Sequence, residues 1–322
     1  MAAADDDIRL DRWFKKHFPD VNHVRLQKWL RTGQVRLDGG RAKAGARVRE
    51  GQTIRVPPIG DATPPITDRP VKPATVDRAR VAELQARVLH RDKDVLIIDK
   101  PAGLAVQGGS GVNEHLDGYL DALRFDADER PRLVHRLDKD TSGVMVLARN
   151  GAAARWLAEA FRRRSTRKLY WAVVVGVPQI EAGIIDAPLD KRLAGGGERM
   201  EMVDDGEGQV AKTVYRIVAR AGRVASWLAM EPLTGRTHQL RVHAADALHT
   251  PILGDGKYGG ANAYLESSDV SRKLHLHARG IRIPLPAKGA IEAYAKLPAH
   301  MATTFSFFGF EEFQAGKGFL EP

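Results

Sequence analysis

The chain has 322 residues, of which 43% are hydrophobic and 28% charged, as in an ordinary globular protein with one large domain or a larger and a smaller one. It has no cysteine, which excludes disulfides, thiolate catalysis and Cys-ligated metal. It shows neither a signal-peptide pattern nor a run of about 18 apolar residues, so we expect a cytoplasmic protein without a membrane span. The net charge of +10 favours a polyanionic partner, nucleic acid before an anionic membrane surface.

The surplus of positive charge is concentrated near the N-terminus. The segment from Ile8 to Val56 carries a net charge of +9. Its apolar spacing predicts helices over Ile8–Phe18 and Asn22–Thr32, followed by short strands at Gln34–Leu37 and Thr53–Val56. This pattern indicates a small basic module rather than a diffusely basic protein.

The second predicted helix separates apolar from basic residues. Its apolar face holds Leu26, Trp29 and Leu30. Lys28 and Arg31 fall on the opposite face, Arg25 lies at the margin, and Arg36 continues the basic surface in the next strand. A solvated charged face would explain any one of these cations, but acidic partners are nearly absent here, and this favours binding to phosphates.

The order of short motifs in residues 1–57 resembles that of the S4 RNA-binding module. The matching pieces are Arg9-Leu10-Asp11, Gly33-Gln34-Val35, Asp38-Gly39 and Gly51-Gln52-Thr53-Ile54-Arg55-Val56. The resemblance implies a small N-terminal S4-like α/β RNA-binding domain, with Arg25, Lys28, Arg31 and Arg36 as its RNA-binding residues.

A proline-rich stretch follows the basic module. Residues 57–75 hold six of the 17 prolines, a composition that breaks helices and central strands. We therefore predict an extended linker over 58–80 and a second domain over 81–322.

The most informative segment of the second domain is H-R-L-D-K-D-T-S-G at His135–Gly143, a polar loop that leads into a predicted buried strand at Val144–Ala148. Asp138 stands between Arg136 and Lys139, so its carboxylate is expected to stay ionised and would suit a nucleophile or an anionic base. A salt-bridged Asp that only orders the loop is the alternative.

Two further polar clusters follow along the chain. Residues 161–170 hold five cations and no anion, and end in a predicted strand, Lys168–Val175, that places Lys168 and Tyr170 on one face. Residues 233–243 contain Arg236, Arg241 and two histidines, in a segment with helical character. No carboxylate stands at a spacing that would complete a metal site with these histidines or with His275 and His277, so we predict none.

Taken in order, HRLDKDTSG, the K-x-Y of Lys168–Tyr170, and GRTHQLRVH followed by PILGDGKYG at Gly235–Gly259 resemble the RluA family of pseudouridine synthases. The preceding VLIIDKPAG resembles most the RluC branch, which modifies large-subunit ribosomal RNA. The resemblance implies an α+β catalytic domain around a largely antiparallel mixed sheet. Predicted strands at Val95–Asp99, Ala211–Arg220 and Val224–Met230 are compatible with it, and residues 190–209 read as a Gly-rich hairpin excursion.

The resemblance also implies roles for single residues. Asp138 would be the catalytic carboxylate, with Arg241 as its ion-pair partner and Arg236 as the second candidate for that place. Tyr170 would stack on the uracil and Arg136 would displace the uridine from its helix, while Lys168 and His135 would help to bind the substrate. No cofactor or metal is implied, and the ionised Asp could attack the ribose or the uracil, or take a proton from C2′. The expected partner is ribosomal RNA, pre-ribosomal or naked, and the protein is expected to act as a monomer.

Two other functions remain open from the sequence. A non-catalytic RNA-binding or ribosome-assembly protein could keep this fold, although it would tolerate the loss of Asp138, Tyr170 or Arg241, all of which are present. Glycoside or metal-assisted hydrolysis would need a second acid, for which Asp140 is the nearby candidate.

Overall fold

The structure is a computed structural model that describes residues 7–19, 21, 23–58, 77–109, 112, 114–194, 197–204 and 206–316. The chain divides into two compact units, Met1–Ala74 and Thr75–Pro322. Most of the predicted linker, residues 59–76, lies outside the described residues. Helix α3 (Arg78–Ala86) begins within the last residues of that linker, because the Asp77 side chain caps it by accepting the Ala79 N–H at 3.0 Å.

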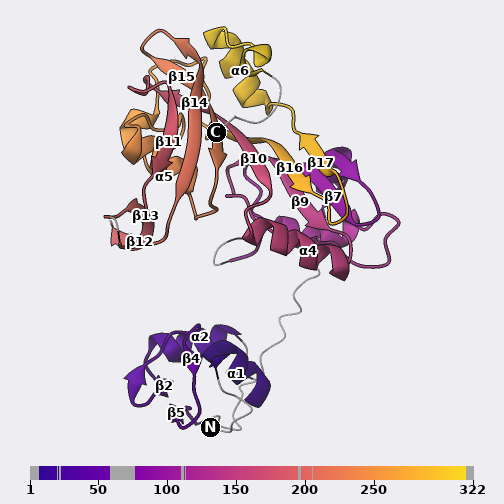
Figure 1. Ribbon diagram of the computed structural model, residues 1–322, viewed down its shortest axis with the longest axis vertical. Coiled ribbons are helices and arrows are strands. Elements are labelled where there is room, and N and C mark those ends of the chain that lie inside the picture. The colour runs from indigo at the N-terminus through magenta and orange to yellow at the C-terminus, as the bar shows by residue number, and fades with distance from the viewer. Residues whose placement is uncertain are drawn as a thin grey trace. The chain divides into compact units, whose positions relative to one another are not determined.

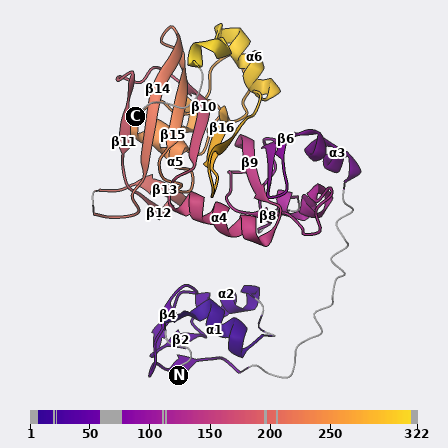
Figure 2. The ribbon, with the colours of Figure 1, turned by 45° about the vertical axis from the view of Figure 1, so that its right-hand side comes forward.

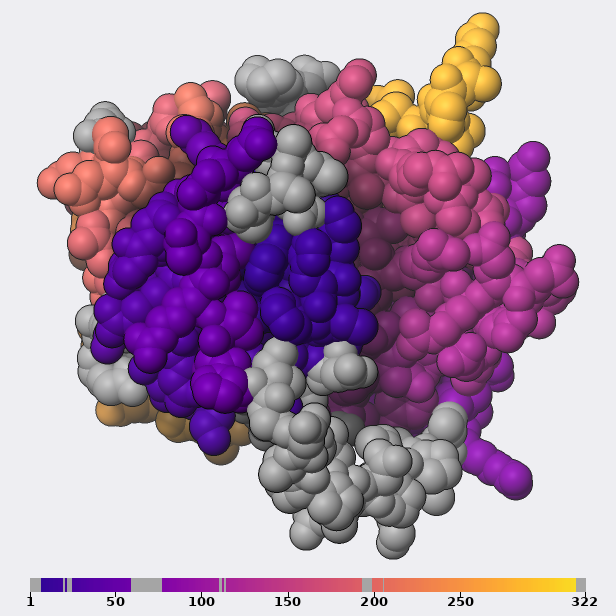
Figure 3. Space-filling model, turned by 90° about the horizontal axis from the view of Figure 1, so that it is seen from below, coloured from indigo at the N-terminus to yellow at the C-terminus, as the bar shows by residue number. Residues whose placement is uncertain are grey.

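In its described residues, the first unit has two helices and five very short strands, in two sheets of order β1-β4 and β3-β2-β5. The elements are β1 (Ile8–Arg9), α1 (Leu10–His17), α2 (His23–Arg31), β2 (Arg36–Leu37), β3 (Gly40–Arg41), β4 (Arg47–Val48) and β5 (Ile54–Arg55). The helix predicted from Ile8 begins two residues later, because Ile8 and Arg9 pair with Val48 and Arg47. One face of this unit is seen in indigo and violet in Figure 3.

Helix α2 has the two faces that its spacing predicts. Leu26, Trp29 and Leu30 are buried in the core of the unit, whereas Lys28 and Arg31 are exposed. The helix ends where the Thr32 hydroxyl donates to the carbonyl of Lys28 and the next residue, Gly33, takes a φ of +70°.

The second unit is built on a mixed sheet that, in the described residues, has ten strands in the order β11-β14-β15-β10-β16-β9-β7-β6, with β17 beside β16 and β8 beside β9. The strands are β6 (Val88–Arg91), β7 (Val95–Lys100), β8 (Arg132–Leu133), β9 (Ser142–Ala148), β10 (Arg167–Val175), β11 (Ala182–Asp186), β14 (Lys212–Ala221), β15 (Ala225–Pro232), β16 (Leu276–Pro284) and β17 (Ala290–Tyr294). Within this part of the chain the β16–β9 pair is parallel and the others are antiparallel, so the predicted α+β class and largely antiparallel mixed sheet are confirmed. Figure 2 shows β14 and β15 side by side as long strands.

Helices cover both faces of the sheet, because the strands at its centre are apolar on both sides. In β9 and β7, one set of alternating residues packs on α4 (Gly151–Arg162), and the other packs on α3 and the 3-10 helix η2 (Leu116–Leu123). In β10, Leu169, Trp171 and Val173 pack against α6 (Ala299–Phe308), while Ala172 and Val174 face the opposite side, toward Leu240. Figure 1 shows α4 and α6 at separate parts of this unit.

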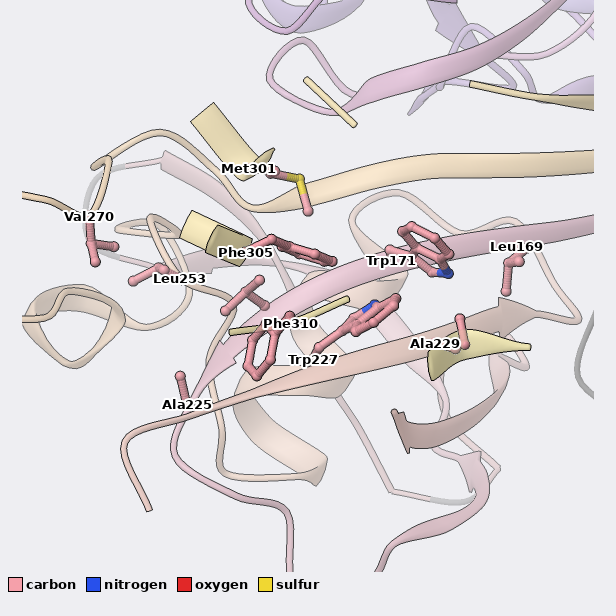
Figure 4. Packing of buried hydrophobic residues seen from close by; sticks show 12 residues of the cluster. Leu169, Trp171, Ala225, Trp227, Ala229, Leu253, Val270, Met301, Phe305 and Phe310 are labelled. Atoms are coloured by element: carbon pink, nitrogen blue, oxygen red, sulfur yellow. The ribbon is translucent and has the colours of Figure 1, made fainter. Parts of the chain in front are cut away.

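The cluster beneath α6 is mainly aromatic. Figure 4 shows the rings of Trp171, Trp227, Phe305 and Phe310 gathered between β10, β15 and α6. The two tryptophan rings meet edge to face at 4.7 Å, and Phe305 lies 4.8 Å from Trp227. This packing makes the β10–β15 pair a rigid support for the residues on its other face.

The remaining elements lie outside the main sheet. They are the hairpin of β12 (Leu189–Ala194) and β13 (Gly197–Met202), helix α5 (Gln239–Val242) with the π-helical turn η3 (His243–Ala247), and the 3-10 turns η4 (Gly260–Ala263) and η5 (Glu312–Ala315). The hairpin confirms the excursion predicted over 190–209. None of the helices in the described residues is long and apolar enough to cross a bilayer.

Candidate active site

The three polar motifs that the sequence singles out meet at one cavity of about 560 Å³ in the second unit. Its lining comes from residues within 135–141, 161–170 and 232–241, together with Leu276. All seven residues that the sequence proposes for catalysis or substrate binding in this unit line it, namely His135, Arg136, Asp138, Lys168, Tyr170, Arg236 and Arg241. Segments about 100 residues apart are thus joined at a single site.

A buried lysine, Lys100, supports the loop that contains Asp138 through hydrogen bonds to backbone carbonyls. Lys100, the last residue of β7, is fully buried, and its Nζ donates to the carbonyls of Pro101, Leu104 and Lys139 at 2.9, 2.9 and 3.0 Å. Burial lowers the pKa of Lys100 to about 8, although nearby carboxylates, Asp138 among them, act in the opposite direction. In the sequence, Lys100 only follows Asp99 at the end of an apolar run, a position that by itself does not show this support.

Asp138 itself is partly exposed to the cavity. Its side chain is 23% exposed, and the nearest basic side chain in the described residues is that of His238, whose Nε2 lies 3.7 Å from Oδ1. Among the described residues that line the cavity, Asp138 is the one carboxylate, and Asp140 is exposed and outside the lining. Asp140, the second acid that hydrolysis with two cooperating carboxylates would need, is therefore not brought to this cavity.

Lys168 and Tyr170 come from β10, and both face the cavity as predicted, although the register with β16 shifts between Leu169 and Tyr170. Burial, and secondarily the charge of Asp138, raises the pKa of Tyr170 above its usual value, so the ring remains a neutral phenol. Burial, and secondarily the charge of Arg164, lowers the pKa of Lys168 to about 8. The site thus sets an uncharged aromatic ring beside a carboxylate and a lysine.

The prediction that Arg241 pairs with Asp138 is wrong. Its Nε and Nη2 donate to Oδ2 and Oδ1 of Asp255 at 2.8 and 2.6 Å. The Asp255 side chain is fully buried, and a buried carboxylate needs a partner of opposite charge, which the planar fork of an arginine satisfies at both oxygens. Asp255 lies in the PILGDGKYG segment, but nothing in the spacing of that segment shows which cation it meets.

Arg236, the second candidate for the partner of Asp138, is also engaged elsewhere. Its Nε donates to the carbonyl of Val210 at 3.0 Å, and its Nη1 donates to the side-chain oxygen of Gln209 at 2.7 Å. It lines the cavity and makes no ion pair with Asp138 within the part of the chain that the structure describes. It therefore anchors the 232–241 segment to the strand region preceding β14.

His135 supports the site through its ring and not through charge. Its Nε2 accepts the backbone N–H of Val146 at 2.8 Å, and the ring stacks on Phe161 at 4.5 Å. Burial, and secondarily the charge of Lys168, lowers the pKa of His135 to about 3. The imidazole is therefore neutral and orients the loop against β9.

Three other buried histidines form hydrogen bonds with hydroxyl side chains of the protein. His243 meets Thr213, His275 meets Thr304, and His277 meets Ser142, at 2.9, 2.8 and 2.8 Å respectively. Over the described ranges, no group of three or more His, Asp or Glu is arranged to hold a metal ion. These residues are structural: His243 and His275 connect the sheet region to helical segments, and His277 connects β16 to β9.

A deep cavity with one carboxylate, a neutral tyrosine and a cationic rim, set on a largely antiparallel sheet, defines an enzyme that acts on an anionic aromatic substrate. Residues 94–246 match the family described as RNA pseudouridylate synthase. The chain belongs to this family, the RluA family of pseudouridine synthases, which are isomerases. The resemblance of the motifs in the second domain to this family is confirmed.

Relatives and solved structures agree with this assignment. The chain is 34% identical to ribosomal large subunit pseudouridine synthase C of Vibrio cholerae, over 92% of this chain and 93% of the relative. It is 33% identical to the mitochondrial RNA pseudouridine synthase 4 of Arabidopsis thaliana, over 92% of this chain and 78% of the relative. The structure of human RNA pseudouridylate synthase domain containing 4 matches 72% of this chain and 96% of its own, with a TM-score of 0.59 and 33% identity.

Proposed function

We propose that this protein converts particular uridines of large-subunit ribosomal RNA to pseudouridine, acting as a cytoplasmic monomer and without a cofactor. The choice of RNA is supported by the similarity to the Vibrio enzyme over nearly the whole of both chains. The chemistry is supported by one observation above all: Asp138 is the one carboxylate among the described residues that line the cavity.

The isomerisation needs few groups. The N1–C1′ bond breaks, the uracil turns, and a C5–C1′ bond forms; a proton leaves C5 and one is taken up at N1, so no oxidant or reductant is consumed. Attack on the ribose, attack on the uracil and removal of the C2′ proton all require an ionised carboxylate beside the glycosidic bond. We assign this role to Asp138, with the Tyr170 ring stacking on the uracil.

The target base must leave its helix to reach the cavity, which costs a few kcal/mol of lost stacking and pairing. Arg136 and Arg164 line the cavity, and their guanidinium groups have no partner among the described residues. We assign them to the displaced strand and its phosphates, together with Lys168. Arg241 remains part of the site in this proposal, because it lines the cavity and its Nη1, which makes no hydrogen bond within the described residues, is left for the substrate.

The test is a pseudouridine map of all cellular RNA with the gene present, deleted and restored. We expect the loss of specific large-subunit sites, and their return with the wild-type gene. Loss confined to transfer RNA would replace the proposed substrate, and an unchanged map would favour the non-catalytic ribosome-assembly alternative. Release of free uracil from RNA by the purified protein would indicate hydrolysis instead of isomerisation.

The first unit is proposed to dock the enzyme on RNA through α2. Lys28 and Arg31 are exposed there, and Arg25 lies 4.7 Å over the Trp29 ring. Arg36 differs from these, because its guanidinium donates to the carbonyls of Gly33 and Gly39 at 3.2 and 2.9 Å. We therefore assign Arg36 mainly to holding the turn.

Replacing both exposed cations, as Lys28→Gln with Arg31→Gln, is expected to weaken RNA binding and to flatten its salt dependence. Each lost phosphate contact lowers the slope of log K against log salt by about 0.7–0.9. Fluorescence titration of an rRNA fragment at several salt concentrations measures both effects. The matched control is Arg220→Gln, near the end of β14, with Arg223→Gln in the turn between β14 and β15; neither residue lines the cavity. An equal loss in the control would show a general charge effect.

A further inference from the structure

His238 lies beside Asp138. In the sequence it belongs to a pair of histidines that could bind a metal, for which no completing carboxylate is found. His238 lines the cavity, and its side chain is 19% exposed. Its Nδ1 lies 2.6 Å from the Tyr258 hydroxyl, and its Nε2 lies 3.7 Å from Oδ1 of Asp138. The imidazole therefore stands between a tyrosine and the carboxylate that we propose for catalysis.

The backbone of His238 is held in an unusual conformation. Its φ of +54° and ψ of 19° lie in the left-handed region, which glycine adopts readily and which is uncommon for other residues, although Asn, Asp and His enter it more often than most. Strain of this kind persists where the surrounding structure requires it, and it gathers at functional sites. Here it directs the ring of the residue that precedes α5 into the cavity instead of along the helix.

The two neighbours of the ring determine which nitrogen carries the proton. If Nδ1 donated to Tyr258, the bare lone pair of Nε2 would face the negative carboxylate of Asp138, which is unfavourable. If instead the Tyr258 hydroxyl donates to Nδ1, the N–H is at Nε2 and faces Asp138. A histidine oriented by a second hydrogen bond in this way presents a fixed donor.

Tyr258 is suited to the donor role. It is 6% exposed, and its ring lies edge to face with His238 at 5.5 Å. Its backbone N–H donates to Oδ1 of Asp255 at 3.3 Å, so the buried Arg241–Asp255 pair also fixes its place. Burial raises the pKa of Tyr258 above its usual value, so the phenol keeps its proton.

We infer that His238 is a positioning residue, whose Nε2–H, with its tautomer set by Tyr258, orients the carboxylate of Asp138 toward the substrate. The 3.7 Å separation closes to a hydrogen bond when the base enters, as catalytic contacts often tighten in the complex. The inference rests on the proposed role of Asp138. The groups that face the ring are Asp138 and Asp255, which favour its charged form, and Arg241 and Lys257, which oppose it.

Two isosteric substitutions separate this role from a purely structural one. His238→Gln keeps a donor at the place of Nε2, whereas His238→Asn keeps an acceptor, its amide oxygen, at the place of Nδ1, where the Tyr258 hydroxyl donates. Asn also suits the left-handed backbone better than Gln. A structural role predicts that the Asn variant is the better enzyme, whereas a positioning role predicts that the Gln variant is.

We expect His238→Asn to lower kcat about 10- to 100-fold, with KM within about threefold of wild type, and His238→Gln to recover most of the loss. Tyr258→Phe should lower kcat in the wild-type background and have no further effect in His238→Asn. The substrate is an rRNA fragment containing a mapped uridine. Tyr215→Phe is the control, because that hydroxyl donates to the carbonyl of Ile180 at 3.2 Å, outside the cavity lining.

The outcomes distinguish the inference from the function on which it rests. An active Asp138→Asn enzyme would overturn the proposed role of Asp138 and the inference with it. An inactive Asp138→Asn enzyme together with a fully active His238→Asn enzyme would overturn the inference alone. A Gln variant slower than the Asn variant, with both folded by thermal unfolding, would assign His238 to structure.

Discussion

Asp138→Asn is expected to abolish pseudouridine formation, with a loss of at least about 10³-fold, while binding of the RNA persists. The amide has nearly the shape of the carboxylate but cannot ionise, and no other described residue of the cavity lining can supply a carboxylate. The loop should keep its form, because the Thr141 N–H bonds to the backbone carbonyl of Asp138, at 3.2 Å, and not to its side chain.

The loss of turnover can be measured with an rRNA fragment whose uridine carries a hydrogen isotope at C5. This hydrogen is released when the C5–C1′ bond forms. Asp140→Asn is the matched control, because it removes an exposed acid two residues away. We expect full turnover from the control. Retained turnover in Asp138→Asn would remove Asp138 from the mechanism, and loss of binding would make it a docking residue.

Gly143→Ala is expected to unfold or severely destabilise the second unit. Gly143 has a φ of +107°, and a Cβ built there would lie 2.2 Å from the carbonyl oxygen of Ala278. These two residues face each other in the parallel β9–β16 pair, so the strands would have to separate. We expect a cost above about 4 kcal/mol, from the clash and the strained backbone together.

A loss of this size would lower the thermal midpoint by about 8–16 °C in a unit of this length. Gly109→Ala is the control, because its Cβ would meet nothing within 4 Å and its backbone is not left-handed. Its midpoint should stay close to that of the wild type. A wild-type midpoint for Gly143→Ala would mean that the two strands can part without loss, and that the close approach is not a constraint on the fold.

Much of the sheet and most of the site lining were predictable from local pattern. The apolar runs at Val95–Asp99, Val144–Ala148 and Lys168–Val175 form strands, because alternating or continuous apolar residues bury well in a pleated sheet. The motifs around Asp138, Tyr170 and Arg241 identify the residues that line the cavity, since a long motif carries the chemistry in its residue types.

Ion-pair partners were not predictable in the same way. Arg241 was expected beside Asp138, but it binds Asp255, and the partner of a guanidinium depends on which buried carboxylate the folded chain brings within about 3 Å. The place of His238 beside Asp138 was not predictable, because neither the left-handed backbone nor the neighbouring Tyr258 can be inferred from spacing. The role of Lys100 was not predictable either, because the three carbonyls that its ammonium group contacts come together only in the folded chain.

The sequence by itself determined the basic N-terminal segment, the apolar patterns of the strands and the motifs that contain Asp138, Tyr170 and Arg241. These features depend on residue type and on spacing within one element. Only the tertiary structure decided which charges meet, which histidine faces the carboxylate and how closely β9 and β16 approach at Gly143. The physical reason is that hydrogen bonds and ion pairs act over a few ångströms, and the residues that come so close are brought together by the packing of the whole sheet.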